Sequence, residues 1–390
     1  MTTQDSQVVI AGVAEQVMGR GNPAPPYRRL VVDTALATLQ DAKMEIGDID
    51  GVVLCTSIPQ PFEWSAAEVA EHLGIGPAWV ATLPYGGKPA TAVVEMARGA
   101  IKAGLATNVL VIGADNYATT LGLEGAIELL ADGLDAQYEQ PFGPLIPTAF
   151  AMMAMRHMKD YGTTLEQLAA IPVAARRHAA LNPQAEIRDP LTVEDVVADR
   201  VITSPFTRSM VALVSTGGSQ GFVVSAASSV NDADRSVEIL GYGECGGFMN
   251  ITQAKSLTEF EHTKRAGENA FRQAGIDRSD LDFAELYDPV AIVPIILLED
   301  LGFCAKGEGG AFVEDGAVEL GGRLPIITHG GVSAYRHPGM GGPLDCVVEA
   351  VVQLRGEAGD RQVRNAETGL VHGEGSWLAN NAIVILGKPQ

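Results

Sequence analysis

Two stretches of the sequence share a pattern that decides how the chain is organised. They read GGKPATAVVE at 86–95 and GGPLDCVVE at 341–349, and both contain Pro-x-x-x-Val-Val-Glu after a pair of glycines. Glycine and proline are typical of the residues that open a helix, and the valines predict that its face is buried. Each helix is followed by an apolar stretch typical of a buried strand, at 108–115 and 369–375. The sequence therefore indicates one α/β unit used twice.

A second pair of segments supports this duplication. A helical pattern, an Asp-x-Asp loop and an apolar strand occur in that order twice, ending in GVVLC at 51–55 and FAELY at 283–287. Chance similarity between short alanine-rich helices is the weaker explanation, because both pairs keep the same order. We expect two halves, 1–235 and 236–390, with residues 117–215 inserted in the first half.

Length, charge and cysteine content exclude several classes of protein. The chain has 390 residues, more than one core usually organises, and 27 Lys+Arg against 48 Asp+Glu give a net charge of −21. Such acidity argues against a nucleic-acid partner. The densest apolar run, 289–298, contains two prolines and is too short to span a membrane. No secretory signal is evident, so we expect a cytoplasmic protein, and the four scattered cysteines predict no metal site.

Three further strings carry a resemblance to a known family. They are YGTTLEQLAAIPVAARRHAALNPQA at 161–185, LEDLGFCAKGEGGAFVEDG at 298–316 and HGGVSAYRHPGMGG at 329–342. In this order they resemble the lipid-transfer, or sterol-carrier-type, branch of the thiolase superfamily. The resemblance covers most of the chain. It implies an α/β thiolase fold, a duplicated five-layer αβαβα arrangement with an inserted helical region.

The chain departs from that family at the nucleophile. Thiolases carry a reactive cysteine at the start of the first central helix, and the matching position falls near Gly87. No cysteine lies between Cys55 and Cys245, so a small error in alignment does not restore one. A second family cysteine matches about His372. Condensation through an acyl-cysteine is therefore not expected.

Tyrosines occupy the positions that face the reaction centre in this family. The family's His-Asn or His-Asp motif is replaced by Glu285-Leu286-Tyr287-Asp288, and the Gly-His-Pro segment reads Tyr335-Arg336-His337-Pro338. Both features resemble the thiolase-like steroid side-chain aldolases of bacterial sterol and bile-acid catabolism. The resemblance implies retro-aldol cleavage of a β-hydroxyacyl-CoA with a D-ring hydroxyl. The products would be a 17-keto steroid and a short acyl-CoA such as propionyl-CoA or acetyl-CoA.

The resemblance also assigns roles to individual residues. Tyr287 and Tyr335 form the acid/base pair, in either order, while His337 and His372 orient the phenols or bind the thioester oxygen. Lowering the pKa of a phenol by about two units corresponds to about 2.7 kcal/mol, which His337, Arg336 or a helix N-terminus would supply. Candidates for binding the oxyanion or substrate are Gly86, Gly87, Asp288, Gly341 and Gly342.

The resemblance also predicts binding partners, and two alternative functions remain possible. The resemblance implies a homodimer that also binds a zinc-ribbon/OB-fold protein of the DUF35 type, and no cofactor beyond the CoA of the substrate. Two other functions stay open. One is a lipid-transfer-type thiolase or acetyltransferase with an unrecognised nucleophile such as Cys55 or Cys346, and the other is a non-catalytic subunit that binds acyl-CoA or lipid.

Overall fold

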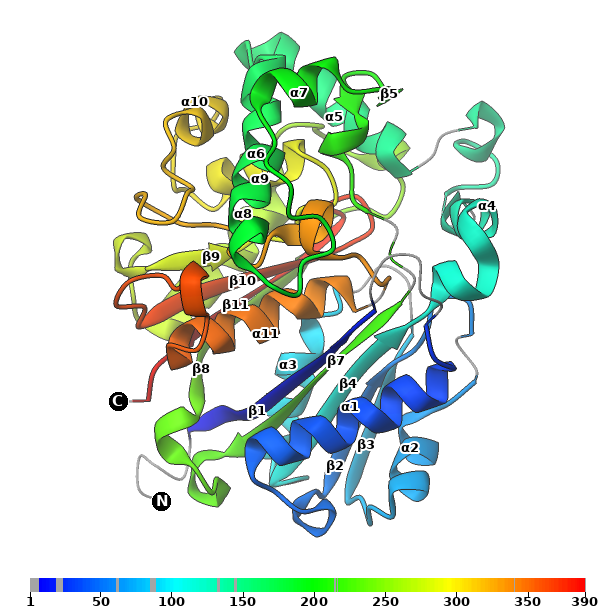
Figure 1. Cartoon of the computed structure of the whole chain (residues 1–390), viewed down its shortest axis with the longest axis vertical. Helices are drawn as coiled ribbons and strands as arrows, with labels where there is room; N and C mark the ends of the chain where they lie inside the picture. Colours follow the sequence, from blue (N-terminus) through cyan, green and yellow to red (C-terminus); the bar gives the residue numbers. More distant parts are fainter. Residues whose placement is uncertain are drawn as a thin grey trace.

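The structure is a computed structural model that describes residues 7–18, 24–60, 63–84, 89–131, 134–143, 146–213, 215, 217–339 and 341–389. A nine-stranded sheet runs through it in the order β3-β2-β4-β7-β1-β8-β11-β10-β9 (Figure 1). The first five strands in this order are β3 (Trp79–Leu83), β2 (Gly51–Cys55), β4 (Asn108–Asp115), β7 (Gly218–Ala226) and β1 (Val8–Val17). The other four are β8 (Val237–Gly246), β11 (Asn380–Gly387), β10 (Thr368–Gly375) and β9 (Phe283–Glu285).

The topology of the sheet repeats about its centre. Outward from the middle, the strands run β1-β7-β4-β2 on one side, with β3 as an additional edge strand, and β8-β11-β10-β9 on the other. In each half the third and fourth strands from the middle, β4 with β2 or β10 with β9, are parallel. The halves join where Val9 pairs with Glu238 and Ile10 with Val237. The sheet is therefore continuous, although its two halves have the same internal order.

Helices form layers on both sides of each half-sheet. Helices α3 (Ala92–Lys102) and α11 (Gly342–Arg355) share one apolar core with strands of both halves. The outer face of the first half is covered by α1 (Tyr27–Ala42) and α2 (Ala66–Leu73), and that of the second by α8 (Glu261–Ala274) and α9 (Ile292–Asp300). The layers alternate helix, sheet, helix, sheet, helix. This confirms the predicted five-layer α/β architecture.

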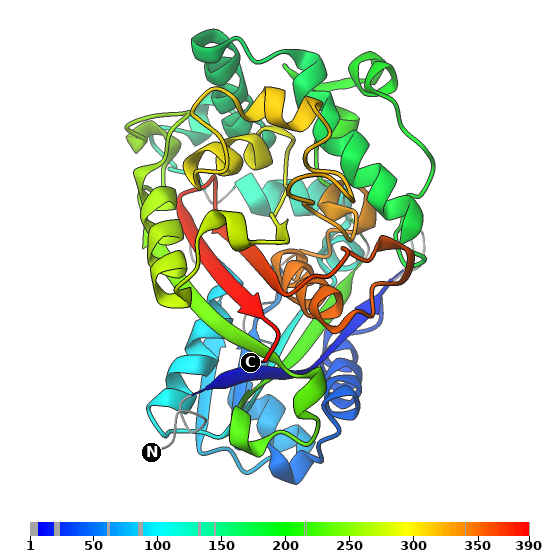
Figure 2. The ribbon, with the colours of Figure 1, turned by 90° about the vertical axis from the view of Figure 1, so that its left-hand side faces the viewer.

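The segment between β4 and β7 packs on the second half of the chain. It contains α4 (Tyr117–Ala131), α5 (Ile146–Tyr161), α6 (Leu165–Leu181), α7 (Val193–Ala198) and the short strands β5 (Val201–Thr203) and β6 (Phe206–Thr207). Buried His157 in α5 lies 3.0 Å from the Glu299 carboxylate in α9. In Figure 2 the green helices of this segment lie beside the yellow helices and above the red strands of the second half. The boundary at 235/236 remains a prediction.

The helices in the described part of the chain were also compared with the length that a membrane span requires. None of these helices combines the length and apolar character that a membrane span requires.

Glycines in β8 set how closely α8 approaches the sheet. A Cβ atom at Gly243 would lie 1.9 Å from the Ala266 carbonyl oxygen of α8, which is far inside contact distance. We expect Gly243→Ala to lower the free energy of unfolding by about 1–3 kcal/mol, because helix and strand would have to separate. Urea denaturation followed by circular dichroism measures the change.

Gly99 in α3 provides the matched control. It is exposed, and a Cβ atom there would meet nothing within 4 Å. Gly99→Ala should raise the free energy of unfolding by about 0.5–1 kcal/mol, since alanine favours a helix interior. Equal effects of the two substitutions would contradict the close approach of α8.

Candidate active site

Tyr287 and His337 form a hydrogen-bonded pair at the start of α11. Tyr287 follows β9, and the alternation of side chains along that strand directs it to the α11 side of the sheet, as it does Glu285. The Tyr287 hydroxyl lies 2.8 Å from His337 Nε2. The backbone N–H of His337 donates to Ser215 Oγ at 2.8 Å, which fixes the loop that carries the imidazole. The structure thus brings together two of the predicted site residues from separate segments.

The protonation state of His337 follows from its surroundings. Although the ring is partly exposed, burial of its nitrogens disfavours the imidazolium and lowers the pKa of His337 to about 4. The ring is therefore neutral near pH 7, and Nε2 can accept the proton of the Tyr287 hydroxyl. A neutral His337 would act on the phenol through this hydrogen bond, and its predicted effect on the pKa of Tyr287 remains a prediction.

The glycines at the start of α11 leave space for the pair. A Cβ atom at Gly342 would lie 3.2 Å from His337 Cδ2, and one at Gly341 would lie 2.1 Å from Gln220 Oε1. The Gly342 N–H already donates to the Gly339 carbonyl at 3.0 Å. Close packing thus explains glycine at both positions, and the oxyanion-binding role of Gly341 and Gly342 remains a prediction. The other two glycines predicted to bind the oxyanion, Gly86 and Gly87, lie outside the described residues.

Asp288 shapes the segment that leads to Tyr335. Its buried carboxyl group accepts a hydrogen bond from the Val332 N–H at 2.9 Å and lies 3.3 Å from the Ser333 hydroxyl. Both contacts are in the π-helical turn η9 (Gly331–Tyr335). Burial raises the pKa of Asp288 to about 7 despite these hydrogen bonds. Its carboxyl group therefore holds the turn, and its role toward substrate remains a prediction.

Tyr335 belongs to a different group of contacts from Tyr287. Its side chain is 2% exposed, its ring meets His329 edge-on at 5.3 Å between centroids, and the Arg336 guanidinium lies 5.0 Å from its centre. Burial raises the pKa of Tyr335 well above its ordinary value, although Arg336 acts in the opposite direction. The charge of Arg336 does act to lower the pKa of Tyr335, as expected, but burial outweighs it, so Tyr335 remains protonated. Among the described residues, no ring contact or hydrogen bond joins the two tyrosines.

Arg336 anchors the loop between Tyr335 and His337. The guanidinium is fully buried and donates to the Gln16 carbonyl at 2.6 Å and to the Glu15 carboxylate at 2.9 Å, both in β1. It also bonds Asp345 in the first turn of α11, with Nε 3.1 Å from the carboxylate. Removing one partner of such a buried pair typically costs about 3–5 kcal/mol. Arg336 therefore fixes the loop to both halves of the molecule.

His372 points to the other face of the sheet. A Cβ atom at its neighbour Gly373 would meet Thr91, beside α3, so the alternating side chain of His372 faces away from α3. There His372 Nε2 lies 2.8 Å from Asn381 Oδ1, and Asn381 donates to Thr263 in α8. Burial lowers the pKa of His372 to about 4. The structure does not place this histidine with Tyr287 and His337.

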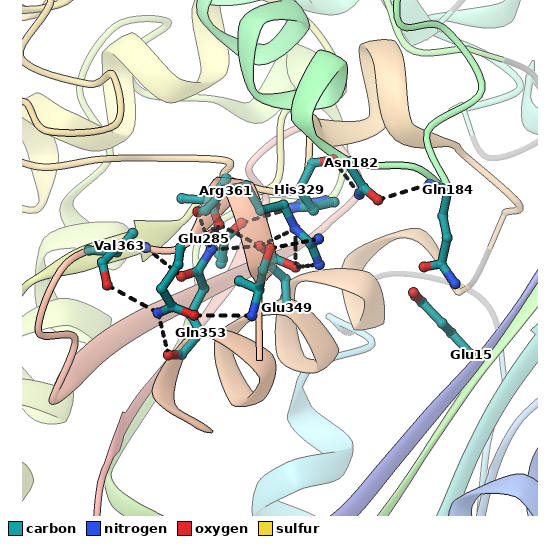
Figure 3. Close-up of polar contacts among 12 residues, drawn as sticks. Glu15, Asn182, Gln184, Glu285, His329, Glu349, Gln353, Arg361 and Val363 are labelled. Carbon is teal, nitrogen blue, oxygen red and sulfur yellow. Dashed lines mark hydrogen bonds and ion pairs between the residues drawn. The ribbon is translucent and has the colours of Figure 1, made fainter. Parts of the chain in front are cut away.

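A buried ionic cluster that was not predicted from the sequence contains Glu285, His329, Glu349 and Arg361 (Figure 3). Glu285 lies 2.9 Å from His329 Nδ1 and accepts from the Thr328 hydroxyl at 2.6 Å. Glu349 accepts from Arg361 at 2.9 Å. Burial would lower the pKa of His329, but the hydrogen bond and charge of Glu285 raise it to about 9. The repeated Val-Val-Glu pattern, which contains Glu349, was the one available signal.

Cys346 lies beside Glu285 and His329, so a thiol, a carboxylate and an imidazole, all groups that can bind metals, are close together. Its sulfur and the ligand atoms of Glu285 and His329 all lie within 4.8 Å of one another. Both oxygens of Glu285 already take part in hydrogen bonds, to Thr328 and His329. Burial also raises the pKa of Cys346 well above its ordinary value, so the thiol is not a thiolate ready for a metal. The donor set fits a hydrogen-bonded ion pair better than a metal centre.

Comparisons with known proteins agree with this architecture. The family model "Thiolase C-terminal domain-like" matches residues 243–388. A steroid side-chain-cleaving aldolase from Thermomonospora curvata is 32% identical over 91% of this chain and 92% of its own length. An acetyl-CoA acetyltransferase from Methanothermobacter thermautotrophicus is 30% identical over 93% of this chain and 94% of its own length.

A solved structure extends the likeness to the whole fold. The structure of an Ltp2-ChsH2(DUF35) aldolase covers 99% of this chain and 99% of its own chain, with a TM-score of 0.85 and 29% identity. Its aldolase subunit thus shares the fold end to end. With the duplicated five-layer arrangement and the two long sequence matches, the chain belongs to the thiolase superfamily, in the group that includes steroid side-chain-cleaving aldolases.

Proposed function

We propose that this protein is a carbon–carbon lyase that cleaves a β-hydroxyacyl-CoA whose hydroxyl is on the steroid D ring. The products are a 17-keto steroid and a short acyl-CoA such as propionyl-CoA or acetyl-CoA. The observation that carries the proposal is the 2.8 Å hydrogen bond between Tyr287 and His337, in a chain that lacks the thiolase cysteine. Relatives named as a steroid side-chain-cleaving aldolase and a 17-hydroxy-3-oxo-4-pregnene-20-carboxyl-CoA lyase, each 32% identical, support it.

Retro-aldol cleavage needs two proton transfers and no nucleophile. As the Cα–Cβ bond breaks, the substrate hydroxyl loses its proton and becomes the ring ketone, while the acyl-CoA leaves as an enolate. We assign the first transfer to the Tyr287–His337 couple, in which Tyr287 receives the substrate proton as it passes its own to Nε2. Tyr335, which stays protonated, is assigned the return of a proton to the α-carbon.

The thiolase alternative requires a reactive thiol. It is supported by the 30% identity to an acetyl-CoA acetyltransferase. Cys55, at the end of β2, is fully buried, and burial raises its pKa to about 12, while the pKa of Cys346 is also raised by burial. Both residues are therefore neutral thiols, which are poor nucleophiles. The lyase is the better-supported function.

The assembly and location of the protein are part of the proposal. The edge strand β3 has alternating side chains that are partly exposed, and pairing it with a second copy would cover its free backbone groups. We propose a homodimer formed there. The aldolase structure with a DUF35 protein supports a DUF35 partner. We further propose that the complex is cytoplasmic and that CoA enters only as part of the substrate.

Phenylalanine substitutions test the two tyrosines. Tyr287→Phe removes the hydroxyl from the couple, and we expect kcat for ketone release to fall by about 10²–10⁴-fold, the usual range for loss of acid–base catalysis. Tyr335→Phe should cause a similar loss if it returns the second proton. Mass spectrometry of the steroid ketone, with the DUF35 partner present, measures both.

Tyr138→Phe is the matched control, because Tyr138 is 61% exposed in the insertion. It should keep wild-type kcat. Full activity of Tyr287→Phe would refute the couple and favour a non-catalytic subunit or another site. Full activity of Tyr335→Phe would remove Tyr335 from the mechanism while leaving the couple.

Cysteine replacement separates the lyase from the thiolase. We expect Cys55→Ala and Cys346→Ala to retain ketone release, with losses in stability of about 1–3 kcal/mol from the lost packing. Intact-protein mass spectrometry should find no acyl adduct on the wild type during turnover. An adduct that either replacement abolishes would establish the acyl-cysteine route instead.

The pH dependence of kcat reports on His337. Since the neutral ring must accept a proton, kcat should fall as the pH drops toward about 4, where His337 becomes charged before reaction. His337→Gln, whose amide does not titrate, should be slower and should lack this acid limb. A wild-type limb near the ordinary histidine pKa of about 6.5 would contradict a buried neutral His337.

A further inference from the structure

A small cavity lies between Tyr335 and the buried ionic cluster. Its volume is about 10 Å³, close to the space that one water molecule needs. The polar residues that line it are Glu15, Asn182, His329, Tyr335, Asp345, Glu349 and Arg361. They come from β1, the segment after α6, the loops around η9, α11 and η10 (Gly359–Arg361). The cavity, which we call the Tyr335 cavity, is therefore lined by both halves of the chain.

Two buried polar atoms at this cavity lack a partner with full hydrogen-bond geometry among the described residues, although the neighbouring Glu15 carboxylate interacts with the Tyr335 hydroxyl and contributes to its raised pKa. The two atoms are His329 Nε2 and the Tyr335 hydroxyl, and both side chains are 2% exposed. Leaving such groups unsatisfied in the interior is unfavourable. Their other contacts are fixed, because His329 Nδ1 is bound to Glu285 and the two rings meet edge-on. A small polar ligand with two or more hydrogen bonds fits this arrangement.

We infer that the Tyr335 cavity binds one ordered water molecule, which bridges His329 Nε2 and the Tyr335 hydroxyl, and that His329 is a positioning residue for Tyr335. Water suits the site because positive and negative groups line it together. Arg361 is balanced by Glu349, and the Glu15 carboxylate interacts with Arg336. The same site would disfavour a bound anion or cation.

The water supplies a balanced proton path. When Tyr335 protonates the enolate carbon, its oxygen becomes a phenolate. The water then gives a proton to that oxygen and takes the proton of His329 Nε2, so His329 becomes neutral while still bonded to Glu285. Burial would lower the pKa of His329, but Glu285 holds it at about 9, so the ring carries that proton near neutral pH. This catalytic role rests on the proposed function, whereas the water site does not.

The charged groups around the path come from every element packed against it. They are Glu15 from β1, Glu285 from β9, Arg336 from the loop, Asp345 and Glu349 from α11, and Arg361 from η10. None of these carboxylates donates or accepts a proton in the path. If a decline of kcat near pH 9 disappears when His329 is replaced, the decline is therefore due to deprotonation of His329.

Two substitutions of His329 separate the water contact from the Glu285 contact. The amide of His329→Asn occupies the place of Nδ1 and keeps the bond to Glu285, while that of His329→Gln reaches the place of Nε2. Crystals of the wild type diffracting to about 1.5 Å should show a water within about 3.2 Å of both His329 Nε2 and the Tyr335 hydroxyl. The water should persist in His329→Gln and be lost in His329→Asn.

The role of His329 in catalysis is tested by measuring the rate of ketone release with the DUF35 partner present. We expect kcat of His329→Asn to fall by about 10–100-fold with KM within about threefold, and to lose the decline above pH 9, while His329→Gln keeps more activity. No density in the wild-type cavity would overturn the water site. Wild-type kcat and pH profile in His329→Asn would overturn the role of His329. An inactive wild type would refute the proposed function, and the crystals would still decide the water site.

Discussion

The fully buried Arg336 guanidinium is the contact on which the site depends. It binds Glu15 and the Gln16 carbonyl of β1 and Asp345 of α11, so one side chain joins the first half, the second half and the loop between Tyr335 and His337. Because Tyr335 and His337 are its chain neighbours, their positions follow from this anchor. A buried charge held by two carboxylates is costly to disturb. The loop is therefore rigid where the reaction needs fixed geometry.

The same loop has two faces with different electrostatics. On one face, His337 is neutral and bonds Tyr287 at 2.8 Å, beside glycines that leave space at the start of α11. On the other, Tyr335 stays protonated near a cluster that carries paired charges. Two phenols in different environments suit two proton transfers of opposite direction. This explains how a fold built for thiol chemistry can support cleavage without a thiol.

Much of the fold was predictable from local patterns. The repeated Pro-x-x-x-Val-Val-Glu gave the equivalence of α3 and α11, and the absence of cysteine between Cys55 and Cys245 excluded the family nucleophile. The resemblance named Tyr287 and His337 as site residues, but their direct hydrogen bond was not predicted, because the expected partner of Tyr287 was Tyr335. The side of the sheet to which His372 points could not be predicted, because it depends on the register of β10 and on the contact of Gly373 with Thr91. The pairing of Glu285 with His329 could not be predicted either, because it brings together two residues 44 positions apart.

The central claim is that this chain breaks a carbon–carbon bond by proton transfer alone. The most direct measurement is turnover of a steroid β-hydroxyacyl-CoA in D₂O, without added CoA and with the DUF35 partner, followed by NMR and mass spectrometry of the products. The account predicts equal amounts of ring ketone and short acyl-CoA, with one deuterium on the α-carbon of the acyl-CoA. A requirement for free CoA, or an acyl group retained on the protein, would contradict it.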